Sequence, residues 1–163
     1  MSEAGAPPAF AVERTLGRLA RWLRILGYDA AWGSHLAGRG LLALARAEGR
    51  TVLTRDRRLA ASTQPPPRLL VQSDHFREQL RHVASALGLD GARRFGRCLE
   101  CNRPLEPVAC EDARTHVPEY VFATQHAFRR CAGCGRIFWD ATHRQHVEAE
   151  LAALGVPGIE ARP

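Results

Sequence analysis

Four of the five cysteines form two pairs that have the spacing of a metal site. Each pair has two residues between its cysteines, and about thirty residues separate one pair from the other: Cys98, Cys101, Cys131 and Cys134. Four thiolates are the number that a tetrahedral structural zinc ion requires, and a zinc ion held by four cysteines is closed to water and substrate. Four unconnected buried thiols are the alternative, which this spacing disfavours. The pattern therefore predicts a structural zinc site.

The residues around the two pairs also suit a zinc ribbon. Asn102 and Gly135 follow the second cysteine of each pair and tolerate a left-handed backbone, which lets backbone amides point at the sulfurs. Between the pairs, residues 119–123 (EYVFA) can form a strand, and residues 136–139 (RIFW) can form its partner. A module this small cannot bury enough apolar surface alone, so its stability is expected to depend on the metal.

The other sulfur and imidazole side chains are isolated in the sequence. Cys110 has no partner at ligand spacing and is expected to be an ordinary small side chain. His143 and His146 lie three residues apart on a predicted helix, but no third ligand for a catalytic zinc ion is evident. Surface or nucleic-acid contacts are therefore the favoured role of these histidines.

Two carboxylates follow short apolar runs in the first half of the chain. Glu13 follows "AFAV", and Asp56 follows "TVLTR". Residues 9–90 alternate such runs with helical patterns, which predicts a parallel sheet with helices on its faces. The carboxyl ends of parallel strands share one edge of the sheet, so Glu13 and Asp56 are expected to converge there. Carboxylates that hold a divalent ion in a basic groove are typical of phosphodiester hydrolysis.

A third acid, Asp74, comes just after the run "LLVQ" that would form the fourth strand. It is a candidate to complete the acidic site at the strand ends. The alternative is that Asp74 is the N-cap of the helix that begins "HFREQL", and this role is at least as favoured.

The segment "ERTLGRLARWLRILG" has the pattern of an amphipathic helix. A stripe of leucine and alanine lies on one face, and four arginines lie on the other: Arg14, Arg18, Arg21 and Arg24. A solvated surface helix is one interpretation. Because a solvated face usually mixes charges of both signs, four arginines without interleaved carboxylates also indicate a surface that binds phosphate.

Composition bounds the class of protein and its partners. The chain has 163 residues and a formal net charge of +6, and it contains no lysine, so every basic residue outside histidine is arginine. This balance favours a polyanionic partner, nucleic acid first. No stretch is apolar enough to span a membrane, and the N-terminus lacks the layout of a signal peptide, so we expect a cytoplasmic protein that does not bind membranes. Cysteines in such a chain favour metal over disulfides.

Two parts of the chain differ in character. Residues 9–90 carry the α/β pattern, and residues 97–154 carry the cysteine pairs and a last helix. The junction between them is basic and rich in glycine. We expect two domains with these boundaries, and we expect residues 1–8 and 155–163 to be flexible.

Several segments together resemble one family. The segments "FAVERTLGRLARWLRILGYDA", "LLALARAEGRTVLTRDRRL", "EQL", "CLECN" and "CGRIFW" resemble the Mut-7 C-terminal ribonuclease domain in their order and spacing. The resemblance runs from about Phe10 to Leu154. It implies a PIN-like α/β fold, a parallel sheet flanked by helices, with a small C-terminal zinc ribbon and a terminal helix. It also implies RNA cleavage by magnesium or manganese held at the strand ends, with Glu13 and Asp56 at the positions of two family acids.

The chain departs from the family pattern at two places. Glu13 stands where the family usually has Asp, which moves the carboxylate oxygens by one methylene, and magnesium demands near-ideal octahedral geometry. The second helix of the family usually opens with acidic residues, but this chain reads "HLAGRGLLALA" and has Arg39 there. An arginine at this position would weaken the binding of a divalent ion.

These observations favour a metal-dependent ribonuclease with a basic groove. Its catalytic acids would be Glu13, Asp56 and Asp74, and its RNA contacts would come from seven basic side chains: Arg14, Arg18, Arg21, Arg24, Arg39, Arg55 and His143. An RNA-binding protein of the same fold that has lost catalysis is the first alternative. A zinc-ribbon module that binds other proteins is the second, and the basic charge disfavours it.

Overall fold

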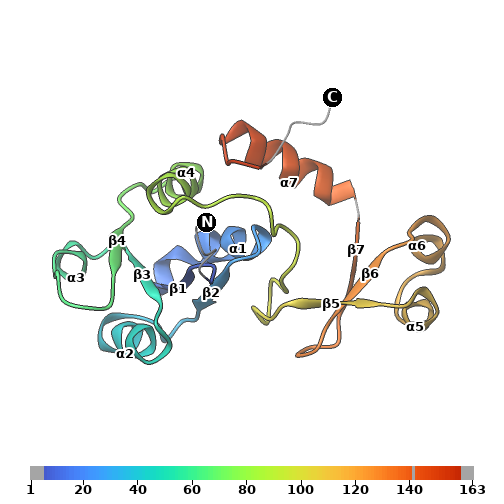
Figure 1. Ribbon diagram of the computed structural model, residues 1–163, viewed down its shortest axis with the longest axis horizontal. Helices are drawn as coiled ribbons and strands as arrows, with labels where there is room; N and C mark the ends of the chain where they lie inside the picture. The colour runs from blue at the N-terminus through green and yellow to red at the C-terminus, as the bar shows by residue number, and fades with distance from the viewer. Residues whose placement is uncertain (1–5, 141, 159–163) are drawn as a thin grey trace, which may run out of the picture.

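The computed structural model describes residues 6–140 and 142–158 and has two sheets at opposite ends of its long axis (Figure 1). None of the described helices is both long and apolar enough to cross a membrane. The elements are, in chain order, β1 (Ala9–Val12), η1 (Arg14–Leu16), α1 (Gly17–Ile25), β2 (Asp29–Trp32), α2 (Gly38–Glu48), β3 (Thr51–Thr54), α3 (Arg57–Ala60), β4 (Arg68–Leu70), α4 (Phe76–Leu87), β5 (Leu105–Val108), α5 (Cys110–Ala113), η2 (Arg114–His116), α6 (Glu119–Thr124), β6 (Phe128–Cys131), β7 (Ile137–Trp139) and α7 (Thr142–Ala153).

The first sheet is parallel and has the strand order β2-β1-β3-β4. Successive side chains of a strand point to opposite faces, and both faces are covered. Phe10, Val12 and Leu53 belong to a core shared with α1 and α4, and Ala11 and Val52 belong to a second core under α2. The prediction of a parallel sheet flanked by helices is therefore confirmed. We call residues 9–87 the α/β region.

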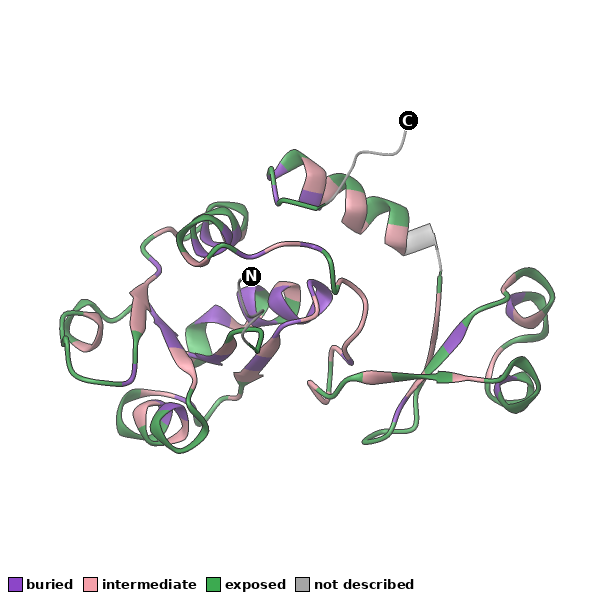
Figure 2. Ribbon diagram, viewed as in Figure 1, coloured by how far each residue is buried: buried purple, intermediate pink, exposed green. Residues whose placement is uncertain are grey.

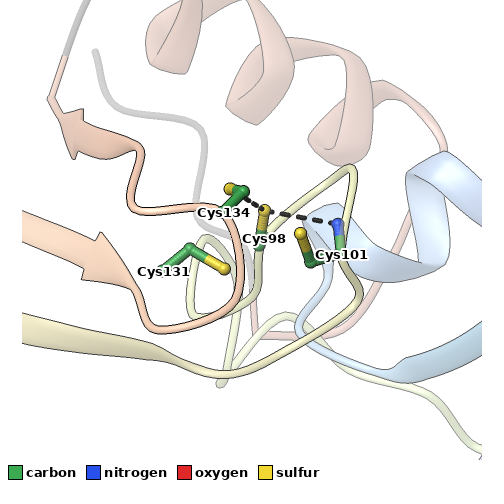
Figure 3. A group of neighbouring side chains, drawn as sticks. All are labelled: Cys98, Cys101, Cys131 and Cys134. Carbon is green, nitrogen blue, oxygen red and sulfur yellow. Dashed lines mark hydrogen bonds between the residues drawn. The ribbon is translucent and has the colours of Figure 1, made fainter.

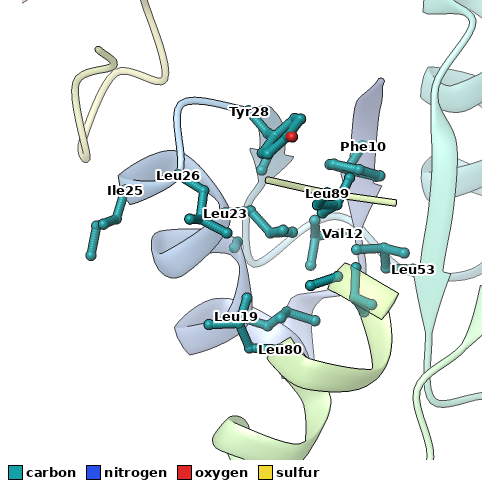
Figure 4. Close-up of a cluster of buried hydrophobic side chains, with 14 of the residues drawn as sticks. Phe10, Val12, Leu19, Leu23, Ile25, Leu26, Tyr28, Leu53, Leu80 and Leu89 are labelled. Carbon is teal, nitrogen blue, oxygen red and sulfur yellow. The ribbon is translucent and has the colours of Figure 1, made fainter. Parts of the chain in front are cut away.

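Helix α1 supplies much of the larger core through its apolar stripe (Figure 4). The leucines and alanine predicted to form that stripe are all buried, each at most 1% exposed: Leu16, Leu19, Ala20, Leu23 and Leu26. Burial of one leucine side chain stabilises a fold by about 2 kcal/mol, and truncation to alanine in a packed core costs about 2–5 kcal/mol. This packing holds α1 against the sheet and fixes the strand ends at one edge.

The second sheet is antiparallel, with the order β5-β6-β7, and we call residues 97–139 the cysteine region. The predicted strand over residues 119–123 is wrong: this segment is helix α6, and the partner of β7 is β6. Pro118 precedes α6, and its carbonyl accepts hydrogen bonds from Val121 and Phe122 at 2.9 and 3.0 Å. Only one residue of α6, Val121, is buried, where it packs against Phe128 and Ala113.

Helix α7 returns from the cysteine region to the α/β region (Figure 1). Leu151, Leu154 and Val156 are buried in the larger core, and Gly91 donates a hydrogen bond of 2.9 Å to the carbonyl of Pro157. Of the ends expected to be flexible, residues 1–5 and 159–163 lie outside the described residues. The domain boundaries at residues 9–90 and 97–154 stay a prediction.

Candidate active site and metal centre

Glu13 lies at the junction of two neighbouring strands. It follows β1, and its backbone N–H donates to the carbonyl of Leu53 in β3 at 3.0 Å. Its carboxylate Oε2 accepts a hydrogen bond from the Thr54 hydroxyl at 2.8 Å and another from the Arg55 backbone N–H at 2.7 Å. These bonds hold the carboxylate at the carboxyl edge of the sheet. Within the described residues Oε1 has no hydrogen-bond partner, so that oxygen is free to bind a ligand.

Thr54 connects Glu13 to the turn that carries Asp56. Its side chain is fully buried, and its hydroxyl oxygen also accepts a hydrogen bond from the Asp56 backbone N–H at 3.0 Å. One hydroxyl therefore positions both acids. This role of Thr54 was not predicted from the sequence, although a threonine at the end of an apolar strand, two residues before an acid, was an available signal.

Asp56 is exposed and is the N-cap of the short helix α3. Its Oδ1 accepts hydrogen bonds from the backbone N–H groups of Arg58 at 2.8 Å and Leu59 at 3.1 Å. Such a cap stabilises the first turn of a helix by about 1 kcal/mol. The second carboxylate oxygen, Oδ2, accepts no hydrogen bond in the part of the chain that the structure describes. Asp56 is thus fixed through one oxygen and open at the other, as Glu13 is.

Asp74 differs from Glu13 and Asp56 in having an ionic partner within the described residues. Its exposed carboxylate forms an ion pair with Arg55. The alternative role as an N-cap is wrong, because the N-cap of α4 is His75 and no side chain caps that helix. Among residues 6–140 and 142–158, no group of three acidic or imidazole ligands gathers at the strand ends. Glu13 and Asp56 are the two acids after these strands that have no ion-pair partner within the described residues.

The basic side chains predicted to contact RNA fall into three groups. Arg14, Arg18, Arg21, Arg39 and Arg55 are exposed, whereas Arg24 is only 7% exposed. The side chain of His143 lies outside the described part of α7. The phosphate-contact role predicted for Arg24 is therefore wrong, and the other five arginines are accessible to a polyanion.

The buried Arg24 joins α1 to β2 and to the cysteine region. Its Nε and Nη2 donate to the Ala30 carbonyl at 3.0 and 2.9 Å, and its Nη1 donates to the carbonyls of Leu99 at 2.6 Å and Glu100 at 3.2 Å. Burial lowers the pKa of Arg24 from its ordinary value. A guanidinium loses most of its hydration on burial, and these carbonyls replace the lost water contacts. Helical projection cannot show this, because the carbonyls come from a distant segment.

A groove with a volume of about 560 Å³ lies beside Asp74 and α4. It is lined by Arg18, Asp74, His75, Phe76, Arg77, Glu78 and Arg81, so arginines outnumber acids along it. The guanidinium of Arg18 lies 3.6 Å from the centre of the Phe76 ring, a cation–π contact that holds the charge in place. Another cavity, of about 200 Å³, lies between the cysteine region and α7, and its lining does not include Glu13, Asp56 or Asp74.

The four paired cysteines gather into one cluster (Figure 3). All four Sγ atoms lie within 4.8 Å of one another, and the sulfurs of Cys98 and Cys134 are 3.9 Å apart. Sulfurs around a tetrahedral zinc ion, with Zn–S bonds of about 2.3 Å, are about 3.8 Å apart. The cluster can therefore hold a structural metal ion such as zinc, and the sequence prediction that these four thiols come together is confirmed.

The two cysteine pairs have matching turns. Asn102 and Gly135 both have a left-handed backbone, with φ of 59° and 72°. Asn102 donates to the Cys98 carbonyl at 3.0 Å, and Gly135 donates to the Cys131 carbonyl at 2.8 Å. The backbone N–H of Cys101 points at the Cys98 sulfur at 3.4 Å. The expected turns with left-handed residues are therefore confirmed. Backbone amides that face the sulfurs stabilise the thiolate form of the cysteines.

The pKa values of the clustered cysteines also favour a bound cation. Burial opposes ionisation of Cys131, but backbone N–H groups of Cys134 and Gly133 outweigh it and lower the pKa of Cys131 to about 7. The neighbouring Cys134 thiol, together with burial, raises the pKa of Cys101 to about 12. Without a metal the sulfurs cannot all ionise together at neutral pH. A divalent cation removes this conflict, because it stabilises several adjacent thiolates.

Comparison with known families gives one match. A family model described as the Mut7-C RNAse domain matches residues 8–151, most of the chain. The matched range includes Glu13, Asp56 and all four cysteines of the cluster. Neither the curated proteins nor the solved structures contain a match to this chain.

Proposed function

The chain belongs to the Mut7-C RNAse domain family, and from this premise we propose that it is a metal-dependent ribonuclease that hydrolyses RNA phosphodiester bonds at the carboxyl edge of the parallel sheet. The observation that carries this proposal is the paired anchoring of Glu13 and Asp56. Each carboxylate is fixed through one oxygen, and Thr54 links the two. Each keeps its other oxygen free of hydrogen bonds within the described residues, which is the arrangement that a metal ligand needs.

The donor set fits magnesium or manganese. Magnesium is usually bound by one or two carboxylates, several waters and the phosphates of its substrate. Glu13 and Asp56 would supply the two carboxylates. The bound ion would activate water and neutralise charge on the phosphate. Because two acids provide few protein ligands, we expect the ion to bind weakly without RNA and more tightly with it.

The residues around the acids have distinct tasks in this proposal. The Thr54 hydroxyl and the Arg55 N–H orient the Glu13 carboxylate, so that no reorganisation is needed when RNA binds. Arg14 and Arg39 are exposed on the segments that follow β1 and open α2, and their guanidinium groups would bind phosphates. Arg18 and Arg81 would continue this path along the groove beside α4.

A second candidate function is RNA binding without cleavage. The observation that favours it is the ion pair between Arg55 and Asp74, which engages the third acid. The first turn of α2 also contains no acid and carries Arg39 instead. In this case the same edge would bind phosphates through arginines directly, and a metal ion would not be required.

Charge-removing substitutions at the acids distinguish the two functions. We would measure cleavage of labelled RNA with magnesium, with manganese and with neither, for wild type, Glu13→Gln and Asp56→Asn. Asn caps a helix about as well as Asp, so Asp56→Asn removes the charge and keeps the cap of α3. We expect each variant to lose cleavage by about a hundredfold or more. Glu111→Gln, an exposed acid on α5, is the matched control and should cleave as wild type does.

Two outcomes would contradict the ribonuclease proposal. Cleavage that persists in both Glu13→Gln and Asp56→Asn would exclude the carboxylate mechanism. RNA binding by the wild-type protein without cleavage under any metal condition would favour the second function. Asp74→Asn tests the role of the third acid: unchanged cleavage is expected, because Arg55 already engages Asp74.

A further inference from the structure

Trp32 ends β2 with an exposed indole at the carboxyl edge of the parallel sheet. Its side chain is 42% exposed. In the register of the sheet Trp32 lies opposite Val12, the residue directly before Glu13. The indole therefore belongs to the same sheet edge as the strand-end acids, one strand away from Glu13.

The indole is fixed in position although it is exposed. Its Nε1–H donates a hydrogen bond of 3.0 Å to the carbonyl of Arg14, the residue after Glu13. Its ring lies against Gly17 at the start of α1: a Cβ added at Gly17 would lie only 2.6 Å from Cζ2 and 2.8 Å from Cε2. Only glycine permits this contact without a shift of the ring. The ring is thus held on one side by α1 and open to solvent on the other.

The surroundings of Trp32 do not suit a protein partner. In the described part of the chain, Trp32 and Tyr120 are the exposed large hydrophobic side chains, and Tyr120 lies on α6 in the cysteine region. Trp32 is therefore a single aromatic side chain and not part of an apolar patch of the kind that protein interfaces use. Its exposed neighbours include Arg14, whose carbonyl accepts the indole hydrogen bond, and His35, whose ring lies beside Gly33, the residue after Trp32.

An immobile aromatic face next to an exposed arginine, Arg14, suits an unpaired nucleobase. Single-stranded RNA is bound by aromatic side chains on which bases stack and by basic side chains that contact the phosphates. A ring that is already fixed loses little conformational entropy when a base stacks on it. We propose that Trp32 is the platform for one base of single-stranded RNA, next to the phosphate that Glu13 and Asp56 address. This inference rests on the proposed function and adds its substrate class, RNA that is unpaired at this position.

Binding measurements with matched RNAs test the platform. Affinity would be measured without added magnesium or manganese, so that no cleavage occurs, for a single-stranded oligoribonucleotide and a double-stranded RNA of the same length. We expect Trp32→Ala to weaken single-strand binding about tenfold or more, because each stacked base contributes that much. Double-strand binding should change less than twofold. Trp32→Phe should restore part of the affinity, and Tyr120→Ala, the other exposed aromatic, should bind as wild type does.

The substitution Gly17→Ala tests the position of the ring without removing it. The backbone of Gly17 is helical, with φ of −60° and ψ of −37°, so alanine is compatible with the backbone, and its methyl group must displace the indole. We expect Gly17→Ala to weaken single-strand binding as Trp32→Ala does. The intrinsic fluorescence of wild type should be quenched by single-stranded RNA, and this quenching should be lost in Trp32→Phe. Thermal melting of each variant would exclude unfolding as the cause.

The results separate this inference from the proposed function. Equal affinity of Trp32→Ala and wild type for single-stranded RNA would overturn the platform, and so would an equal loss for single-stranded and double-stranded RNA. Either result would leave the dependence of cleavage on Glu13 and Asp56 untouched. Conversely, a selective loss in Trp32→Ala together with no cleavage by wild type would support the platform and favour RNA binding as the function.

Discussion

The two sheets of this protein are stabilised by different means. The α/β region and residues 151–156 share a core of nineteen buried residues, drawn mainly from the parallel strands, α1, α4 and the C-terminal segment. The cysteine region has a core of three buried residues, Ala113, Val121 and Phe128. Figure 2 shows the contrast: buried residues run through the α/β region, and most of the cysteine region is exposed or intermediate. The first region is held by apolar burial, whereas the second needs another source of stability.

The cysteine region is attached to the larger α/β region by directional polar bonds. The cysteine region contacts the α/β region through polar bonds near its first cysteine pair. Arg24 donates to the carbonyls between Cys98 and Cys101, and Asn102 bonds to Asp29 and to the Ala30 N–H. These bonds are directional and specify one orientation of the module. A metal that orders the cysteines therefore also orders the contact between the two regions.

Removal of one metal ligand should have the largest effect on stability. It should unfold the cysteine region and leave the α/β region folded. In zinc-finger peptides a structural zinc ion contributes of the order of 10 kcal/mol or more. The three buried residues of the cysteine region contribute roughly 5 kcal/mol by burial. We therefore expect Cys131→Ser to unfold residues 97–139 and to leave β1 and β3 protected. Hydrogen exchange read by mass spectrometry would measure both, and elemental analysis would show the loss of one zinc ion per chain.

Cys110→Ser is the control for this substitution. Cys110 is exposed and lies on α5 outside the cluster, and its sulfur donates a hydrogen bond of 3.4 Å to the His126 carbonyl. The Cys110→Ser protein should keep its zinc ion and its protection from hydrogen exchange. If Cys131→Ser also retained protection over residues 97–139, the comparison between a metal-held and an apolar region would be wrong.

Local sequence patterns were sufficient to predict much of the α/β region and the meeting of the four cysteines. The apolar alternation of β1 and β3 and the leucine stripe of α1 express local periods of two and 3.6 residues. The cysteine spacing predicted which thiols would meet, because a metal imposes the same short turn in every such pair. Glu13 and Asp56 could be placed at one edge because parallel strands share their direction.

Other features depend on contacts between distant segments and could not be predicted. Residues 119–123 have a composition that suits a strand, but β7 is paired by β6, whose sequence "FRRC" has no apolar alternation. Arg24 has the helical position of a surface residue and is buried because residues 99 and 100 cover it. The ion pair of the Asp74 carboxylate depends on the side-chain conformation of Arg55, which no sequence pattern determines.

Removal of the Arg24 guanidinium should have an intermediate effect and should weaken the contact between the regions. Arg24→Ala leaves the carbonyls of Ala30, Leu99 and Glu100 without this donor. Loss of a charged donor to buried carbonyls costs about 3 kcal/mol. We expect this decrease in the free energy of unfolding, measured with urea, and faster loss of zinc to a chelator.

Arg21→Ala is the matched control for Arg24→Ala, three residues earlier on α1. Arg21 is exposed, and its guanidinium is 3.9 Å from the Glu100 carboxylate, a surface pair that contributes about 0.5 kcal/mol or less. The substitution Arg21→Ala should leave the free energy of unfolding unchanged and lower RNA affinity at low salt, since an exposed arginine can contact phosphate. If Arg21→Ala destabilised the protein as much as Arg24→Ala does, the distinction between the buried and exposed arginines would fail.

The smallest expected effect concerns Asp29, which contacts both regions at the amino end of β2. Burial raises its pKa, but hydrogen bonds from Arg50 and Asn102 outweigh burial and hold the pKa of Asp29 below its ordinary value. Arg50 Nη1 lies 2.5 Å from Oδ1, and Asn102 Nδ2 lies 2.7 Å from the same oxygen. A carboxyl whose pKa is lower in the folded state stabilises the fold above its unfolded pKa, about 3.9, and this contribution is lost as the pH falls through the folded pKa.

Asp29→Asn should therefore destabilise the protein at neutral pH by about 1 kcal/mol or less, since the pair is partly exposed. The difference from wild type should begin to shrink as the pH falls below the unfolded pKa, about 3.9, and should disappear as the pH falls through the lower folded pKa, where the wild-type carboxyl becomes protonated and loses the same interaction. Urea unfolding at pH 6 and pH 3.5 would measure this difference, on protein shown by elemental analysis to keep its metal ion at both pH values. Glu48→Gln, which removes another acid beside Arg50 but has no contact with Asn102, is the control. A difference between Asp29→Asn and wild type that stays constant or widens in acid would mean that the Asp29 carboxylate does not stabilise the contact between the two regions.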